Sequence, residues 1–254
     1  MKIHNTSDFT IKNPVVTIGS FDGLHLGHLS IIDALKKKAK EICGETVIVT
    51  FSPHPRIVLN HDADNLFFLN SLEEKCHLLE KVGIDHLIIL PFDKELSTKT
   101  MEEFFVLYLK NTLHAKALIV GYNHRFGSDR NCDYDTLREL GEREQIEIVR
   151  VEKKGIDERD ISSTTIRNLL KRGDLKHANN YLPHPYFFLS DIDSTGLALY
   201  YQPKKLYPPQ GKYCIELEYN GSSIHTTATI TKSNAIIIEG IDHEIKGAKI
   251  YFLT

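Results

Sequence analysis

The amino-acid sequence predicts an α/β protein with a doubly wound parallel sheet, followed by a small all-β, barrel-like module. Short β-branched runs alternate with helical patterns through the first two thirds of the chain, which is typical of parallel sheets covered by helices on both faces. After Asn180 the pattern changes to short alternating strands. We therefore expect a main domain over residues 1–184 and a β-module over residues 185–254.

The parallel sheet is expected from five apolar, β-branched runs, at residues 14–19, 46–51, 86–90, 117–121 and 146–151. Between the first two runs, Leu29, Ile32 and Leu35 share one face of an expected helix. Two more helices are expected within residues 71–83 and 100–115. Each opens with Ser or Thr and has a carboxylate close behind, the pattern of a capped helix start.

The β-module is expected from residue 185, because Pro183 and Pro185 disfavour continued helix. Five short runs with alternating residues follow and predict strands at residues 197–201, 212–219, 223–230, 235–240 and 249–253. Their number and shortness favour an all-β module.

Composition favours a globular protein of the cytosol. The chain has 254 residues and is 41% apolar, yet no apolar run approaches the roughly 18 to 20 residues that cross a bilayer, and the amino terminus lacks the apolar core of a signal peptide. The four cysteines form no C-x-x-C pair, so neither a zinc ribbon nor a disulfide framework is indicated. A net charge of −3 disfavours nucleic-acid and membrane partners. The sequence does not predict an oligomeric state.

Four segments rich in polar and special residues each follow a predicted strand. They are "GSFDGLHLGH" (19–28), "TFSPHPR" (50–56), "GYNHRFG" (121–127) and "ISSTTIRNLL" (161–170). In a parallel sheet the carboxyl ends of the strands meet at one edge, where ligands bind. The four segments are therefore expected to line one crevice.

The first segment has the composition of an anion site. Gly19 and Gly23 allow a sharp turn, and Gly27 permits close approach at the start of the following helix, whose amino end attracts negative charge. His25 and His28 are three residues apart, so both imidazoles can face one ligand and donate to phosphate oxygens. With an ordinary pKa of about 6.5, each becomes a better donor as negative charge builds in a transition state.

Three other interpretations of this segment compete with phosphate binding. His-x-x-His spacing can bind zinc, but the sequence places no third ligand. The histidines can also merely cap a helix. A dinucleotide fingerprint requires G-x-G-x-x-G, which is not matched here. Phosphate chemistry accounts best for the residues present.

The four segments together carry a resemblance to a known family. "GSFDGLHLGH" resembles the His-x-Gly-His signature of the Rossmann-like nucleotidyltransferase superfamily, and "ISSTTIR" resembles its partner motif. With the two segments between them in order, residues 14–180 resemble the bacterial riboflavin kinase/FMN adenylyltransferases, the bifunctional FAD synthetases. The resemblance implies Mg²⁺-assisted attack of the FMN phosphate on the α-phosphorus of ATP, giving FAD and pyrophosphate.

The resemblance also implies roles for individual residues. The catalytic residues would be His25, His28, Asn123 and Arg167. The nucleotide-binding residues would be Gly19, Ser20, Phe21, His25, Gly27, His28, Ser163, Thr164 and Arg167. The flavin-binding residues would be Pro53, His54, Pro55, Asn123 and Phe126, and no metal ligand is assigned. Simpler interpretations stay open, with Ser163 as an N-cap, Asn123 as a turn residue and Phe126 as a core residue.

The carboxy-terminal module departs from the family. Its members continue into a β-barrel riboflavin kinase whose nucleotide loop contains Pro-Thr-Ala-Asn. This run is absent here, and no convincing match to the catalytic glutamate is found. We therefore expect a reduced, kinase-like module without riboflavin kinase activity.

Two rival functions stay open at this stage. The chain could be a nucleotidyltransferase for another phosphorylated substrate, although "TFSPHPR" argues against the relatives that lack it. It could also be a non-catalytic protein that binds flavin or nucleotide.

Overall fold

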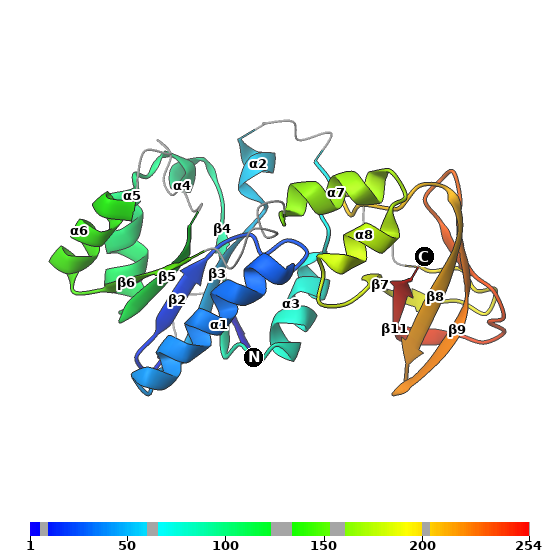
Figure 1. Cartoon of the computed structure of the whole chain (residues 1–254), viewed down its shortest axis with the longest axis horizontal. Helices are drawn as coiled ribbons and strands as arrows, with labels where there is room; N and C mark the ends of the chain where they lie inside the picture. The colour runs from blue at the N-terminus through cyan, green and yellow to red at the C-terminus, as the bar shows by residue number, and fades with distance from the viewer. Residues whose placement is uncertain (6–9, 60–65, 123–133, 153–160, 200–203, 254) are drawn as a thin grey trace. The chain divides into compact units, whose positions relative to one another are not determined.

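The structure is a computed structural model, and it describes residues 1–5, 10–59, 66–122, 134–152, 161–199 and 204–253. Its contacts divide the chain into two compact units (Figure 1). Unit 1 consists of residues 1–21, 27–66 and 76–159, and unit 2 consists of residues 22–26, 67–75 and 160–254.

Unit 1 contains a parallel sheet of six strands in the order β1-β4-β3-β2-β5-β6. The strands are β1 (Lys2–His4), β2 (Val15–Ile18), β3 (Thr46–Ser52), β4 (His86–Pro91), β5 (Ala117–Gly121) and β6 (Glu147–Val151). All five predicted parallel strands are confirmed. The sequence did not predict β1, because a partly exposed strand of three residues shows no clear period.

The order of the strands defines where the chain reverses direction across the sheet. Strand β2 pairs with β3 on one side and with β5 on the other. The chain runs outward from β2 through β3 to β4 and then returns to β5. The carboxyl ends of β2 and β5 therefore flank a topological switch point, where open α/β sheets bind ligands. The segments at 19–28 and 121–127 begin at these two ends.

Helices cover both faces of this sheet. The helices that lie wholly or partly in unit 1 are α1 (Leu26–Glu41), α2 (Pro55–Val58), α3 (Leu72–Lys81), α4 (Lys94–Thr98), α5 (Met101–Phe104), the π-helix η2 (Phe105–Thr112) and α6 (Tyr134–Glu144). Leu118 and Val120 share a core with η2 and α6. Gly121 faces the other way, because successive strand residues alternate, and a Cβ there would lie 3.2 Å from Ile31 Cδ1 of α1. Helix α1 thus packs on the opposite face.

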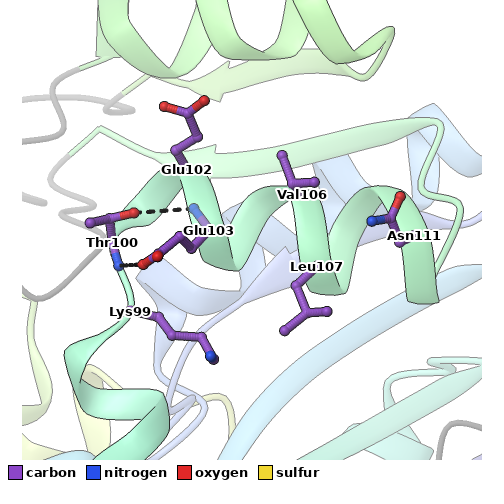
Figure 2. Close-up of a pocket in the computed structure, with 7 residues that line it drawn as sticks. All are labelled: Lys99, Thr100, Glu102, Glu103, Val106, Leu107 and Asn111. Atoms are coloured by element: carbon purple, nitrogen blue, oxygen red, sulfur yellow. Dashed lines mark hydrogen bonds between the residues drawn. The ribbon is translucent and has the colours of Figure 1, made fainter.

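Both predicted capped helices are confirmed. Ser71 Oγ accepts from Glu74 N and Glu74 Oε2 accepts from Ser71 N at the start of α3. Thr100 and Glu103 make the same reciprocal pair before α5 (Figure 2). The second helix differs from the expectation beyond Phe104, where it continues as the eight-residue π-helix η2. The sequence pattern does not distinguish the two kinds of helix, because the buried residues of η2, Phe105 and Leu109, are four positions apart, which is close to one turn of either helix.

The described residues of unit 2 include the helices α7 and α8 and an antiparallel sheet whose strands have the order β10-β9-β8-β11-β7. The elements are α7 (Ser163–Lys171), α8 (Leu175–Asn180), β7 (Tyr186–Ile192), β8 (Gly211–Tyr219), β9 (Ser222–Ile230), β10 (Ile236–Ile238) and β11 (Ile245–Phe252). Four predicted strands are confirmed as β8 to β11. Strand β7 was not predicted, since the prolines just before it were interpreted only as ending a helix.

The segment at residues 193–199 bonds to both edges of this sheet. Ala198 N donates to Ile236 O on the β10 side, and Leu199 N donates to Asp191 O on the β7 side. This double attachment closes the sheet into the barrel-like form that the sequence predicts. The predicted strand at 197–201 forms only isolated bridges at Leu197 and Ala198, and its last two residues lie outside the described part of the chain.

One hydrophobic core serves the helices and the sheet of unit 2. Ile166 of α7 and Leu175 of α8 belong to the same buried cluster as Ile215 and Phe252 of the sheet, and the cluster includes Leu69. Burying each such side chain stabilises the fold by about 1.5 to 3 kcal/mol. The division of activities between residues 1–184 and 185–254 stays a prediction.

Candidate active site

The first segment forms a tight turn after β2. Phe21, Gly23 and Leu24 have positive φ angles of 45°, 85° and 40°. The left-handed region is strained for residues as large as Phe and Leu, and such strain is often found at functional sites. Phe21 is 2% exposed and Leu24 is 1% exposed, so burial of both side chains holds the strained backbone in place. The sequence suggested a turn made by glycine alone.

The two glycines of this turn have different roles. A Cβ on Gly23 would lie 2.5 Å from Leu69 Cδ1 and would also be strained by the positive φ. Gly23 therefore turns the chain, as expected. Gly19 instead leaves room for the Phe21 ring, since its Cβ would lie 3.1 Å from Phe21 Cε2.

Helix α1 starts within the signature. Gly27 and His28 are its second and third residues, and its first turn has no acidic side chain. The His28 ring packs against Phe21, with ring centroids 5.0 Å apart. An amino end without acidic side chains is favourable for an anion, because the exposed N–H groups carry partial positive charge.

Asp22 joins the first segment to the fourth within unit 2. Its carboxylate Oδ2 lies 2.8 Å from Arg167 Nη2, and its Oδ1 accepts from Leu69 N at 2.9 Å and Asn70 N at 3.1 Å. The main-chain oxygen of Asp22 accepts from Ser163 Oγ at 2.9 Å. The expected proximity of these two segments is therefore observed directly. Asp22 is absent from the predicted site residues, because a single Asp in a glycine-rich turn carries no recognisable pattern.

The hydroxyl groups of Ser162 and Ser163, at the start of α7, have different hydrogen-bond partners. Ser162 is the N-cap, and its Oγ accepts from Thr165 N at 3.1 Å. The interpretation of Ser163 as a mere N-cap is therefore wrong, since its hydroxyl bonds to Asp22 instead. Thr164 lies in the same first turn and is exposed.

His25 lies in unit 2, immediately before α1, and is 7% exposed. Burial lowers its pKa to about 4; the positive charge of Arg167 also lowers it, and Asp22 opposes the change. The expected ordinary pKa is therefore wrong for His25. At neutral pH this imidazole is uncharged and donates from a single ring N–H.

Arg167 has donors beyond those that Asp22 uses. Its side chain is 13% exposed, and its buried Nε has no hydrogen-bond partner among the residues that the structure describes. A guanidinium has five N–H donors in a planar fork, which suits the oxygens of a phosphate. Asp22 thus orients the fork and leaves donors for an anionic ligand.

The second segment follows β3 in unit 1. His54 is the N-cap of α2, and its Nδ1 accepts from Arg56 N at 3.2 Å. Pro55 is the first residue of α2 and is half-buried, whereas Pro53 is exposed. His54 therefore has a structural function that the sequence did not predict. Asn123 and Phe126 of the third segment lie outside the described residues.

A groove of about 520 Å³ lies elsewhere in unit 1, over α5 and η2 (Figure 2). It is lined by Lys99, Thr100, Glu102, Glu103, Val106, Leu107 and Asn111. Lys99 pairs with Glu95 at 3.3 Å, and Thr100 and Glu103 cap the helix. None of the predicted site residues lines this groove.

The described residues contain neither a membrane-spanning helix nor a cluster of metal-binding side chains. No helix within the described ranges is both long and apolar enough to cross a membrane. In the same part of the chain, no group of three or more His, Cys, Asp or Glu side chains is placed to hold a metal ion.

Comparisons with known proteins agree with the four-segment resemblance. The family model for FAD synthetase matches residues 9–165. A bifunctional riboflavin kinase/FMN adenylyltransferase of Listeria monocytogenes is 29% identical over 254 residues, covering 92% of this chain and 79% of that protein. An FAD synthetase of the same organism is 35% identical over 194 residues, covering 74% of this chain and 77% of that protein.

A solved structure has the same fold over nearly the whole chain. It is described as a macrolide-efflux protein from Streptococcus pneumoniae, and it superposes with a TM-score of 0.84 at 25% sequence identity. The match covers 99% of this chain and 97% of that one. The likeness therefore includes the carboxy-terminal module.

Proposed function

This chain belongs to the FAD synthetase family, and on that premise we propose that it is an FMN adenylyltransferase. It transfers AMP from ATP to the phosphate of FMN. The observation that carries this proposal is the contact of Asp22 with both Arg167 and Ser163, which joins the two nucleotidyltransferase motifs in one unit. The long helix α1, which starts at the same turn, supports it.

In the proposed reaction an oxygen of the FMN phosphate attacks the α-phosphorus of ATP. The bond from that phosphorus to the oxygen shared with the β-phosphorus breaks, and pyrophosphate leaves. No covalent bond to the protein forms. Such transfers depend on positioning and on stabilisation of charge, rather than on a protein nucleophile.

We assign the phosphates of ATP to the residues around the signature. His28 and the start of α1 would stabilise the charge that builds on the α-phosphate. His25 would donate as a neutral imidazole, since its pKa is about 4. Arg167 would bind the β- and γ-phosphates with the donors that Asp22 leaves unused, helped by Ser163 and Thr164. Gly19, Ser20, Phe21 and Gly27 would lie along the nucleotide.

The flavin is assigned to the second and third segments. Pro53, His54 and Pro55 would form one wall of its site, together with Asn123 and Phe126. Mg²⁺ is expected to accompany ATP and to neutralise charge on the phosphates. We assign no metal ligand to the described residues, and the cytosol stays the predicted location.

The test is FAD formation from FMN, ATP and Mg²⁺, with CTP in place of ATP as a control. We expect FAD and pyrophosphate in equal amounts with ATP and much less product with CTP. Binding of FMN and ATP without turnover would instead support the non-catalytic alternative. Turnover with another phosphorylated substrate, but not with FMN, would support the other rival.

We further infer that the carboxy-terminal module has no riboflavin kinase activity. The missing Pro-Thr-Ala-Asn run and the absent glutamate match support this inference. Riboflavin and ATP should give no FMN under conditions in which FMN and ATP give FAD. FMN formation at a rate comparable to that of FAD would overturn it.

A further inference from the structure

A buried ion pair in unit 2 connects the carboxy-terminal module to the first turn of α3. Lys205 and Glu74 have side chains that are 0% exposed. The Lys205 ammonium donates to Glu74 Oε2, to Leu69 O at 2.9 Å and to Phe187 O at 2.8 Å. It also lies 4.4 Å from the centre of the Phe188 ring. All three donors of this lysine are therefore used inside the protein.

Leu69 is held from three directions. Its N–H donates to Asp22 Oδ1 at 2.9 Å, and its carbonyl accepts from Lys205 Nζ at 2.9 Å. Its side chain packs so closely on Gly23 that a Cβ there would be 2.5 Å from Leu69 Cδ1. We call residues 67–71 the bridge segment. On one side the bridge segment accepts from Lys205. On the other side it bonds to Asp22 and Gly23 of the tight turn after β2, which we call the signature turn.

Further bonds hold the bridge segment on the same two sides. Phe68 N donates to Lys204 O at 2.7 Å, and Leu206 N donates to Phe68 O at 2.8 Å. Asn70 Oδ1 accepts from Gly23 N at 2.8 Å. The path from the module to the signature turn is therefore continuous, and Asp22 extends it to Arg167.

A buried ion pair is an expensive way to stabilise a fold, because both charges lose their water. Apolar residues of similar volume often stabilise a core as well or better. A hydrogen bond from an ammonium group to a carbonyl oxygen specifies the position of that carbonyl, which apolar packing does not. The placement of Lys205 therefore indicates a positional role.

We propose that Lys205 is a positioning residue for the nucleotide site, acting through Leu69 and Asp22 on Arg167. The carboxy-terminal module then supports adenylyl transfer, whether or not it has riboflavin kinase activity. This inference rests on the proposed function, because it requires Arg167 to bind the phosphates of ATP.

The decisive variant removes both charges and keeps the core apolar, with Lys205→Met and Glu74→Leu in the full-length chain. It also removes the acceptors of Ser71 N and Leu189 N, so we expect it to be less stable than the wild type, and ATP binding is measured at a temperature where circular dichroism shows the variant folded. Its KM and Kd for ATP should rise about tenfold to a hundredfold, by analogy with the loss of groups that orient metal ligands, while its KM for FMN stays unchanged. Lys249→Met is the matched control, because Lys249 pairs with Glu218 at 2.6 Å in the same module but has no bond to the bridge segment.

Asp22→Asn tests the other end of the path. It should weaken ATP binding, as the double variant does. Its effect on ATP binding should nearly vanish in a chain that already has Arg167→Met, because the effects of residues that act through one another are not additive. This variant keeps the test open if the double variant does not fold.

The outcomes separate the two proposals. A wild-type protein that neither binds ATP nor forms FAD would overturn the proposed function and this inference with it. An active wild type with unchanged ATP affinity in the double variant would overturn the inference alone. Fully additive losses in Asp22→Asn and Arg167→Met would also overturn it.

Discussion

The two units differ in the kinds of side chain that they bury. The strands of unit 1 have an apolar core in which Val16, Val47 and Leu118 are 0% exposed. Among the described residues, all buried carboxylate and ammonium groups lie in unit 2, at Asp22, Glu74, Lys75 and Lys205.

This difference separates two physical tasks. Apolar burial is non-directional, so it stabilises a sheet without specifying the direction of any donor. A buried charge must be met by partners at defined distances and angles. Apolar packing therefore stabilises the sheet of unit 1, whereas in unit 2 the partners of Asp22 are held at defined positions.

The largest effect on stability is expected at the buried ion pair. Lys205→Ala leaves Glu74 buried without its cation, and the free energy of unfolding should fall by about 3 to 5 kcal/mol. Urea unfolding measures this change. Lys249→Ala in the same module removes a more exposed pair and should cost at most about 1 kcal/mol. Equal losses in the two variants would break the comparison between buried and exposed charge.

The next effect concerns activity at the start of α1. His28→Ala should lower kcat by about 10² to 10³, with a modest change in FMN affinity, because it would remove the donor that we propose for transition-state charge. Single-turnover formation of FAD measures this effect. His177→Ala, at an exposed histidine of α8 that pairs with Asp174, should leave kcat unchanged. A greater loss of FMN binding than of turnover would contradict the role of His28.

The third effect is a pH dependence of stability that originates in unit 2. His25 has a pKa of about 4 when folded and about 6.5 when unfolded, so the unfolded state binds the extra proton between these values. The stability that neutral His25 confers is complete above about pH 6.5 and is lost as the pH falls toward 4, by about 3 kcal/mol.

Urea unfolding at pH 7.5 and pH 5 tests this dependence. His25→Gln should flatten the difference between the two pH values, whereas His177→Gln should leave it as in the wild type. An unchanged difference in His25→Gln would show that other groups cause it.

The smallest effect is expected in the apolar sheet. Ile48→Val in β3, at a position that is 0% exposed, should cost about 0.5 to 1.5 kcal/mol and leave the KM for ATP unchanged. Thermal or urea unfolding with FAD assays provides both values. Ile237→Val, at a position that is 40% exposed, is the control and should cost less. A change in ATP binding by Ile48→Val would show that sheet packing also sets the site.

The sequence predicted the strands of the parallel sheet because each is a continuous β-branched run bounded by polar or special residues. It also located the signature turn and the start of α7, since glycine, histidine and hydroxyl residues have strong local preferences there. It did not predict β1, because a strand of three residues is too short to show an alternating pattern. It did not predict β7, because the two prolines just before that strand indicated only the end of a helix. It misjudged Gly19, whose role depends on the position of the Phe21 ring.

The sequence by itself determined the order of the predicted strands along the chain, the capped helices and the four segments that carry the family resemblance. Each of these features depends on a pattern of residues that are close together in the sequence. Only the tertiary structure decided that Asp22 meets Arg167, that Lys205 meets Glu74 and that His25 is uncharged. These pairings join residues more than a hundred positions apart, or depend on burial, and neither is a local property of the chain.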